Sequence, residues 1–292
     1  MTTVFNVLDY GATGNGVTDD TGAIQTAIND AMVLQSGIYP GGEVYAPPGY
    51  NFFVAGNLTV PKPIRVRFES FISSNLTNSD CLVIGSIGWA QYYDMEFCGF
   101  INIAGNTGTP ASVNTAGANA VHVLNLVFSR LKIGVIQGWT NNGMYLDGTG
   151  EMFSPQVIQH NRISIGQLVN NGVGINCQSL SASTSSVEAN FIHVSDSYQN
   201  FNGTVLDPTN SSGATTSNYF LFDAIDNANT ADGGQGIQVN GSFNRLDITY
   251  LGTNVWFGPG ASYNTLNLYN TAASGATYTA GGTGNVYNRM GG

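Results

Sequence analysis

The sequence predicts an all-β chain folded as a single-stranded parallel β-helix, a solenoid of stacked coils that follows one amino-terminal helix. From about residue 52 onward the chain consists of short β runs of about three to five residues, each bounded by Gly, Asn, Ser or Asp. The runs do not alternate with the two-residue Asn-Gly or Asp-Gly loops that join antiparallel neighbours, so we expect parallel pairing. Representative runs cover residues 64–68, 81–84, 121–127, 162–165, 191–194 and 219–222.

A weak internal repeat supports the stacking of coils. The segment 243–248 (Phe-Asn-Arg-Leu-Asp-Ile) aligns with 263–268 (Tyr-Asn-Thr-Leu-Asn-Leu), and 284–288 continues the pattern. Earlier variants begin at Asn161 and Asn190. A coil of about 20 to 25 residues that buries alternate aliphatic side chains and has Asn at its corners is typical of a parallel β-helix. We expect the corner Asn residues to stack in a column and to adopt the left-handed conformation or bond their own backbone, and roughly ten coils to follow the helix.

The first 50 residues contain the one segment with convincing helical periodicity. Asp19-Asp20-Thr21 opens it, with Asp20 or Thr21 as the N-cap, and apolar residues follow at i, i+3 and i+4 spacing through residue 32. Ser36-Gly37 is expected to end the helix. A strand over 5–8 and a glycine-rich turn over 11–16 precede it, and a strand within 41–50, ended by a proline pair, follows.

The segment 5–28 (FNVLDYGATGNGVTDDTGAIQTAI) resembles the start of pectate-lyase-superfamily proteins, and 42–49 (GEVYAPPG) resembles the segment that starts their first full coil. This superfamily contains right-handed β-helices such as polygalacturonases, alginate epimerases and many phage tailspikes. The resemblance implies a right-handed β-helix in which residues 1–50 form the capping strand, turn and helix and residues 51–292 form one continuous body. Asp9, Asp19 and Asp20 then have a structural role, because backbone N–H groups of the turn and of the helix start would bond their carboxylates.

The composition excludes several classes of partner. Of the 292 residues only 9% are charged, 8 are Lys or Arg, and the formal net charge is −10. Nucleic-acid binding needs clustered cations, so we expect no nucleic-acid partner. No apolar stretch reaches the roughly 18 residues that span a bilayer, so we expect no membrane insertion. The start lacks the basic and apolar regions of a signal peptide.

The three cysteines, Cys81, Cys98 and Cys177, are expected to be small buried hydrophobic residues. Their odd number and wide spacing fit neither a disulfide framework nor a zinc site. We therefore expect no metal, and nothing in the sequence indicates a cofactor.

Hydrolysis of a glycan requires two carboxylates about 5 to 10 Å apart. The catalytic candidates are Asp223, Asp226, Asp196 and Glu151. Asp223 and Asp226 form the best local pair, because the β run 219–222 leads into them, and Glu151 lies four residues after Asp147. A solvated turn carboxylate is the alternative interpretation of each. The motifs that carry catalysis in polygalacturonases and alginate epimerases are missing, and eight scattered cations argue against a polyanionic substrate bound without a metal.

Aromatic rings near glycine-rich or asparagine-rich segments are candidates for sugar contact, because a flat ring stacks on a sugar face while amides bond its hydroxyls. The candidate substrate-binding residues are Trp139, Tyr145, Tyr198, His160 and Arg162. His160 and Arg162 lie two residues apart, which in a strand places them on the same side. Core packing is the alternative for each ring, and a hydrogen-bonded position in the β-helix is the alternative for His122, His160 and His193.

Three functional classes remain. We favour an extracellular or virion-associated spike that recognises a surface polysaccharide or cell-surface glycan, either with or without depolymerising it. A secreted polysaccharide lyase or glycoside hydrolase and a non-catalytic structural virion protein are the alternatives. Spikes of the resembled superfamily associate along their sides, which implies a homotrimer.

Overall fold

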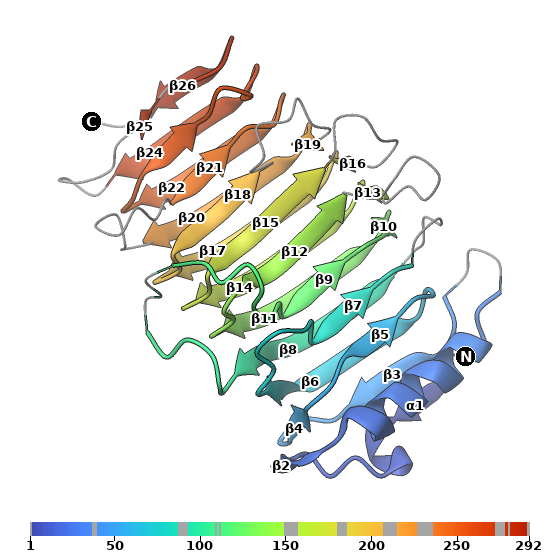
Figure 1. The fold of residues 1–292 in the computed structure, drawn as a ribbon. Helices are drawn as coiled ribbons and strands as arrows, with labels where there is room; N and C mark the ends of the chain where they lie inside the picture. The colour runs from blue at the N-terminus through green and yellow to red at the C-terminus, as the bar shows by residue number, and fades with distance from the viewer. Residues whose placement is uncertain are drawn as a thin grey trace.

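The computed structural model is an elongated stack of parallel strands with an α-helix at its amino-terminal end (Figure 1). It describes residues 2–36, 40–86, 93–108, 110, 112–148, 157–179, 186–206, 215–226, 236–271, 278–279 and 281–290. Successive coils place equivalent strands side by side, and these neighbours pair in parallel. The predicted parallel β-helix behind an amino-terminal helix is therefore confirmed.

The strands form three sheets that run along the stack, which we call sheets 1, 2 and 3. Sheet 1 contains β1 (Val4–Asn6), β2 (Asn15–Asp19), β3 (Glu43–Ala46), β4 (Asn51–Val54), β6 (Arg65–Ser74), β8 (Asp94–Asn102), β11 (Arg130–Gln137), β14 (Arg162–Val169), β17 (Phe191–Tyr198), β20 (Tyr219–Asp226), β22 (Arg245–Leu251), β24 (Thr265–Thr271) and β26 (Val286–Arg289). Sheet 2 contains β5 (Leu58–Val60), β7 (Leu82–Ile84), β9 (Val121–Val123), β12 (Asn142–Gly148), β15 (Val173–Ser179), β18 (Asn202–Leu206), β21 (Ile237–Val239), β23 (Val255–Phe257) and β25 (Tyr278–Thr279). Sheet 3 contains β10 (Leu126–Val127), β13 (Val157–Gln159), β16 (Ser186–Glu188) and β19 (Thr215–Thr216).

Alternation along each strand builds the core. Inward side chains of sheet 1 form columns in which each residue stacks on its equivalent in the next coil, about 4.8 Å away. One such column reads Val44, Val66, Met95, Leu131, Ile163, Ile192, Phe220, Leu246 and Leu266, all of them buried. Burial of these columns stabilises every coil through its neighbours, because one coil alone cannot bury its apolar face.

A ladder of asparagines lies at the corner that leads into the sheet 1 strand, and all its members except the last are buried. It consists of Asn161, Asn190, Asn218, Asn244, Asn264 and Asn285. From the second member on, each Oδ1 atom accepts hydrogen bonds from the backbone N and the Nδ2 of the Asn one coil earlier, at 2.9–3.1 Å. The predicted column of Asn is confirmed.

The backbone conformation at this corner differs from the prediction. The residue before the ladder position has positive φ, as in His160, Ala189, Phe243 and Tyr263 (φ 54–57°), while the Asn itself bonds the neighbouring coil. Because of this left-handed turn, the side chain of the residue before the Asn points out of the core, and the side chain of the Asn points inward. A second ladder at the corner between sheets 1 and 2, Asn171 to Asn200, follows the same rule, because Asn170 and Gln199 take the positive φ.

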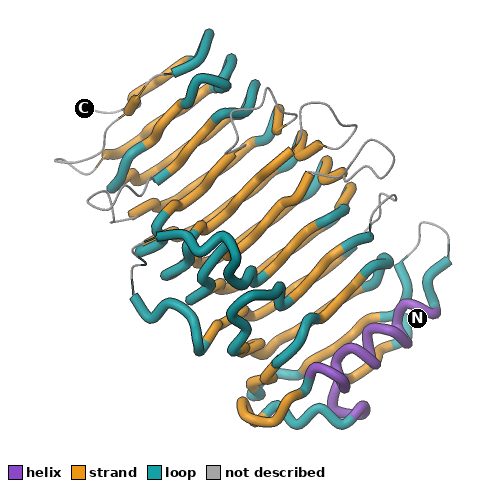
Figure 2. The backbone as a smooth tube through the Cα atoms, viewed as in Figure 1, coloured by secondary structure: helices purple, strands orange, loops and turns teal. Residues whose placement is uncertain are grey.

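The amino-terminal helix α1 (Thr21–Val33) covers the end of the stack (Figure 2). Its own residues Ile24, Ala27, Ile28 and Ala31 are buried. Asp20 occupies the N-cap position, but its carboxylate accepts from Thr13 N (2.6 Å) and Gly14 N (3.1 Å) of the glycine-rich turn. Asp19 instead accepts from Thr21 N at the helix start, at 3.0 Å. The structural role predicted for these two carboxylates is confirmed.

Three details of the sequence prediction are wrong. The expected strand 5–8 ends at Asn6, and a 3-10 turn (Val7–Tyr10) follows. The apolar run 121–127 contains a corner, so it divides into β9 of sheet 2 and β10 of sheet 3. The earlier coils are also longer than the expected 20 to 25 residues, because successive ladder positions are 29, 28 and 26 residues apart before the spacing falls to 20.

The Asn-Gly pairs at 142 and 202 open β12 and β18 and form no hairpin. Cys81 and Cys177 are buried as predicted, Cys98 is partly exposed, and all three are free thiols. Among the described residues no helix is long and apolar enough to span a membrane.

Candidate functional site

A groove of about 400 Å³ runs over the outer face of sheet 2. Outward positions of consecutive strands stand in register there, because alternation turns every second side chain away from the core. The resulting column reads His122, Tyr145, Asn176, Val205, Gln238 and Trp256. Amide side chains of Asn141, Gln178 and Asn202 also line the groove, together with Val113 and Thr115 from the connection between β8 and β9.

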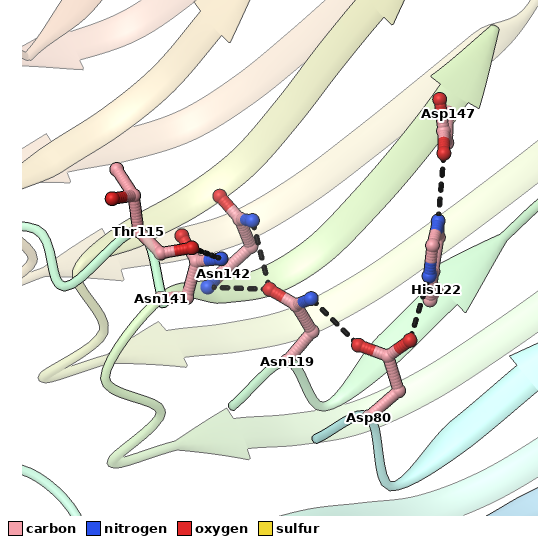
Figure 3. A network of polar contacts seen from close by, with 7 residues as sticks. All are labelled: Asp80, Thr115, Asn119, His122, Asn141, Asn142 and Asp147. Carbon is pink, nitrogen blue, oxygen red and sulfur yellow. Dashed lines mark hydrogen bonds and ion pairs between the residues drawn. The ribbon is translucent and has the colours of Figure 1, made fainter. Parts of the chain in front are cut away.

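A chain of polar contacts crosses three coils at one end of this column (Figure 3). His122 lies between two carboxylates, with Nδ1 2.7 Å from Asp80 Oδ2 and Nε2 3.0 Å from Asp147 Oδ2. Asn119 donates to the other oxygen of Asp80 at 2.6 Å and accepts from both nitrogens of Asn142, at 3.0 and 2.8 Å. The ring of Tyr145 stacks on His122 at 4.8 Å between centroids, so this cluster holds the aromatic ring of the groove in place.

Electrostatics keep His122 charged. Burial opposes the imidazolium, but the hydrogen bonds and charges of Asp147 and Asp80 outweigh it and raise the pKa of His122 to about 9. Burial also opposes the Asp80 carboxylate, yet His122 and Asn119 bring the pKa of Asp80 below its usual value. A histidine protonated at neutral pH and bonded at both nitrogens cannot act as a general base, so it crosslinks coils. This agrees with the interpretation of His122 as a hydrogen-bonded histidine of the β-helix.

Two amide oxygens at the groove lack partners. Asn142 Oδ1 and Asn176 Oδ1 are buried and, among the described residues, have no hydrogen-bond partner. A buried acceptor without a partner costs about 1–3 kcal/mol, so such atoms call for a water or a ligand hydroxyl. With the Tyr145 ring beside them, the groove offers the mixture of flat apolar surface and neutral hydrogen-bonding groups that suits a sugar.

A second cluster, on the outer face of sheet 1, contains three of the predicted catalytic residues. Asp196 lies on β17, and Asp223 and Asp226 lie on the adjacent β20. Burial, and next the charge of Asp226, raise the pKa of Asp196 above its usual value. Asp223 Oδ2 is 3.0 Å from His193 Nε2, and Tyr198 is in register with Asp226. The structure thus couples Asp196 to Asp226 across two coils, where the sequence had paired Asp226 with Asp223.

The other predicted site residues have different positions. Trp139 is fully buried, with Nε1 donating to Phe100 O at 3.3 Å, so the prediction that its ring meets a sugar is wrong. The corner between sheets 1 and 2 turns this side chain inward, at a position that Asn171 and Asn200 occupy in later coils. His160 and Arg162 share a different pocket, at the corner between sheets 3 and 1. Glu151 lies outside the described residues.

Sequence reasoning missed Asp80 and Asn119, and it paired Asp147 with Glu151. Asp80 and His122 lie 42 residues apart in the chain, and nothing local to either residue indicates the contact. The register between coils brings them together. The available signal was the alternation in Val121-His122-Val123, which predicts that His122 points outward.

No group of three His, Cys, Asp or Glu side chains in the described part of the chain could hold a metal ion. Asp80 and Asp147 meet opposite nitrogens of His122, so the three side chains do not converge on one point.

Comparison with known proteins supports the fold. No protein-family profile matches the chain. A protein of Geobacillus virus E2, ORF18, matches in structure over 99% of this chain and 62% of its own, with a TM-score of 0.67 and 16% identity. The chain thus spans less than two thirds of that viral protein.

More distant structural matches are the surface adhesin PfbA of Streptococcus pneumoniae (14% identity, 99% of this chain and 93% of that one, TM-score 0.42) and the A-module of the Azotobacter vinelandii mannuronan C-5 epimerase AlgE4 (15% identity, 98% and 97%, TM-score 0.38). In sequence, 100 residues are 35% identical to the Penicillium expansum protein "Non-secreted LysM effector LysM15", covering 29% of this chain and 7% of that protein.

The fold is a parallel β-helix, as the amino-terminal motif implied.

Proposed function

We propose that this protein is an extracellular or virion-associated β-helix protein that recognises a surface polysaccharide through the groove on sheet 2. The observation that carries the proposal is the in-register column on that sheet, in which Tyr145 is followed by amide-bearing coils and then by Trp256. The structural similarity to a viral protein supports the virion as a location.

The groove suits a neutral sugar chain. Tyr145 and Trp256 are four coils apart, roughly 19 Å at about 4.8 Å per coil, so an oligosaccharide lying along the axis could contact both rings. The groove-lining side chains named above are amides, a phenol, a hydroxyl and aliphatic groups, without a free charge among them. Hydroxyl groups of a sugar would also supply donors for Asn142 Oδ1 and Asn176 Oδ1.

The test is binding of neutral surface polysaccharides, presented on a glycan array and followed by calorimetry. Tyr145→Ala is expected to weaken binding about tenfold, as loss of about 1.4 kcal/mol of ring contact would do. Tyr269→Ala, which removes an exposed ring from sheet 1, is the matched control and should bind normally. Equal binding by both variants, with both folded, would exclude the groove and favour the purely structural alternative.

Cleavage of the glycan is a second candidate function, which the coupling of Asp196 to Asp226 favours. Asp226 is displaced from Asp196 by one coil, about 4.8 Å, and by two residues, about 6.6 Å, so the two positions lie about 8 Å apart. From there the carboxyl groups can take the separation of about 6.5–9.5 Å that inverting glycoside hydrolysis uses. Asp196, whose pKa is raised, would donate the proton, and Asp226 would act as base or nucleophile.

This candidate predicts a pH dependence. Because Asp196 must be protonated, kcat falls as the pH rises through the raised pKa of Asp196. Reducing-sugar release should be lost in Asp196→Asn and in Asp226→Asn. It should be kept in Glu96→Gln, which alters an exposed carboxylate of sheet 1 paired with Lys132. Loss in Asp223→Asn with full activity in Asp196→Asn would instead assign the acid to Asp223.

A further inference from the structure

A separate open pocket of about 850 Å³ lies at the corner between sheets 3 and 1, on another side of the solenoid from the groove. The first residues of β6, β8, β11, β14 and β17 line it, together with the outward side chains of the corner turns. The proposed function uses none of these residues.

Three of the eight cations of the chain gather at this pocket. Along the strand register the order is Arg65, Asp94, Arg130, Arg162 and Phe191. Arg130 Nε and Nη2 are each 2.8 Å from Asp94 Oδ1. Arg162 lies over the Phe191 ring at 5.5 Å and, within the described residues, forms no salt bridge. Three arginines that looked scattered in the sequence thus face one pocket, whose described lining holds a single carboxylate, Asp94. The chain as a whole has a net charge of −10.

The strand register places two of these guanidinium groups next to each other, and their repulsion destabilises the sheet unless an anion lies between them. Arg130 and Arg162 are direct partners on neighbouring strands, and like charges directly opposite destabilise a sheet. Along the register Arg130 lies between Asp94 and Arg162. The Asp94 carboxylate therefore neutralises the charge of Arg130 more than that of Arg162. A carboxylate placed between the two arginines would accept charge-assisted hydrogen bonds from both.

Rings form the apolar side of the pocket. Phe128 and His160 have positive φ (49° and 56°) in consecutive corner turns, which directs both side chains outward. Their rings stack at 4.9 Å between centroids with an interplanar angle of 21°, and Phe191 lies on the adjoining strand. The pocket therefore presents cations next to flat apolar surfaces.

We propose that this corner pocket binds an acidic sugar residue, with its carboxylate between Arg130 and Arg162 and its ring against Phe128 and His160. A free inorganic anion would use the arginines alone, and a neutral sugar would use the rings alone. An acidic sugar uses both parts of the pocket.

The probes are methyl β-glucuronide, methyl β-glucoside and inorganic sulfate, with binding to the full chain followed by ligand-observed NMR. The first two share the sugar ring and differ in the carboxylate. We expect the glucuronide to bind and Arg162→Gln to weaken its binding about tenfold or more, because charge-assisted hydrogen bonds are lost. Phe128→Ala should weaken glucuronide but not sulfate, and Ala189 shows that alanine takes the same corner conformation.

The matched control is Arg245→Gln, because Arg245 lies over the Tyr219 ring at 5.0 Å just as Arg162 lies over Phe191, but outside the pocket. It should bind the glucuronide normally. Equal binding of glucuronide and glucoside, equal binding of glucuronide and sulfate, or an unchanged Arg162→Gln variant would each overturn the proposal, as would no binding of the glucuronide. Tyr145→Ala should keep glucuronide binding, and Arg162→Gln should keep binding of the neutral glycan. The two variants therefore test the groove on sheet 2 and the corner pocket independently of each other.

Discussion

His122 shows how one residue couples the stability of the solenoid to pH. Its pKa in the folded protein is about 9, above the 6.5 of an unperturbed histidine, because Asp80 and Asp147 favour the charged form. The resulting stabilisation is fully present below about pH 6.5 and is lost as the pH rises through about 9. We expect the free energy of unfolding in urea to fall over this range, by at most about 3 kcal/mol.

The variant His122→Gln should unfold more easily at pH 6 and should lose most of that pH dependence. His193→Gln is the control, because His193 pairs with Asp223 on an exposed surface, where an ion pair contributes little. An equally steep fall in stability in His122→Gln would show that other groups cause it.

At the scale of the element, the asparagine ladder is the feature that the repeat encodes. Asn218 Oδ1 accepts from Asn190 N and Nδ2, while Asn218 Nδ2 donates to Val187 O and Asn244 Oδ1. Removing this side chain leaves several buried groups unpaired, at about 1–3 kcal/mol each. We expect Asn218→Ala to lower the free energy of unfolding by at least about 3 kcal/mol, measured by chemical denaturation.

Asn218→Asp tests the donors separately, because it keeps Oδ1 as an acceptor and turns a carboxylate oxygen toward Val187 O and Asn244 Oδ1. It should destabilise about as much as Asn218→Ala, while Asn29→Ala on the exposed side of α1 should change stability by less than about 0.5 kcal/mol. A stable Asn218→Asp protein would mean that the ladder donors contribute nothing.

At the scale of the whole molecule, the solenoid has different surfaces at its two ends. The helix α1 covers the amino-terminal end (Figure 1), whereas towards the carboxyl end Phe243 and Tyr263 are 60% and 56% exposed and stack on each other at 5.2 Å. Exposed stacked rings favour association between subunits. We expect a homotrimer in solution, with a mass three times that of the chain by light scattering.

The double variant with Phe243→Ala and Tyr263→Ala should weaken this assembly, and Ala189 shows that the corner accepts alanine. A monomer of the unaltered chain at micromolar concentration would contradict the prediction. A trimer that persists unchanged in the double variant would place the contact elsewhere on the surface.

The sequence by itself determined the class of fold, because the ladder requires Asn in each coil that it joins and so leaves a repeat at Asn244, Asn264 and Asn285. It also determined the cap, since Asp19 and Asp20 satisfy backbone groups only a few residues away.

Only the tertiary structure decided which side chains share a surface. Contacts such as Asp80 with His122 and Arg130 with Arg162 depend on the register between coils, and coil lengths that vary from 20 to 36 residues conceal that register in the sequence. The same reason explains why Trp139 and Tyr145, six residues apart in the chain, differ in exposure. Trp139 is at a corner position that points into the core, whereas Tyr145 is at an outward position of β12.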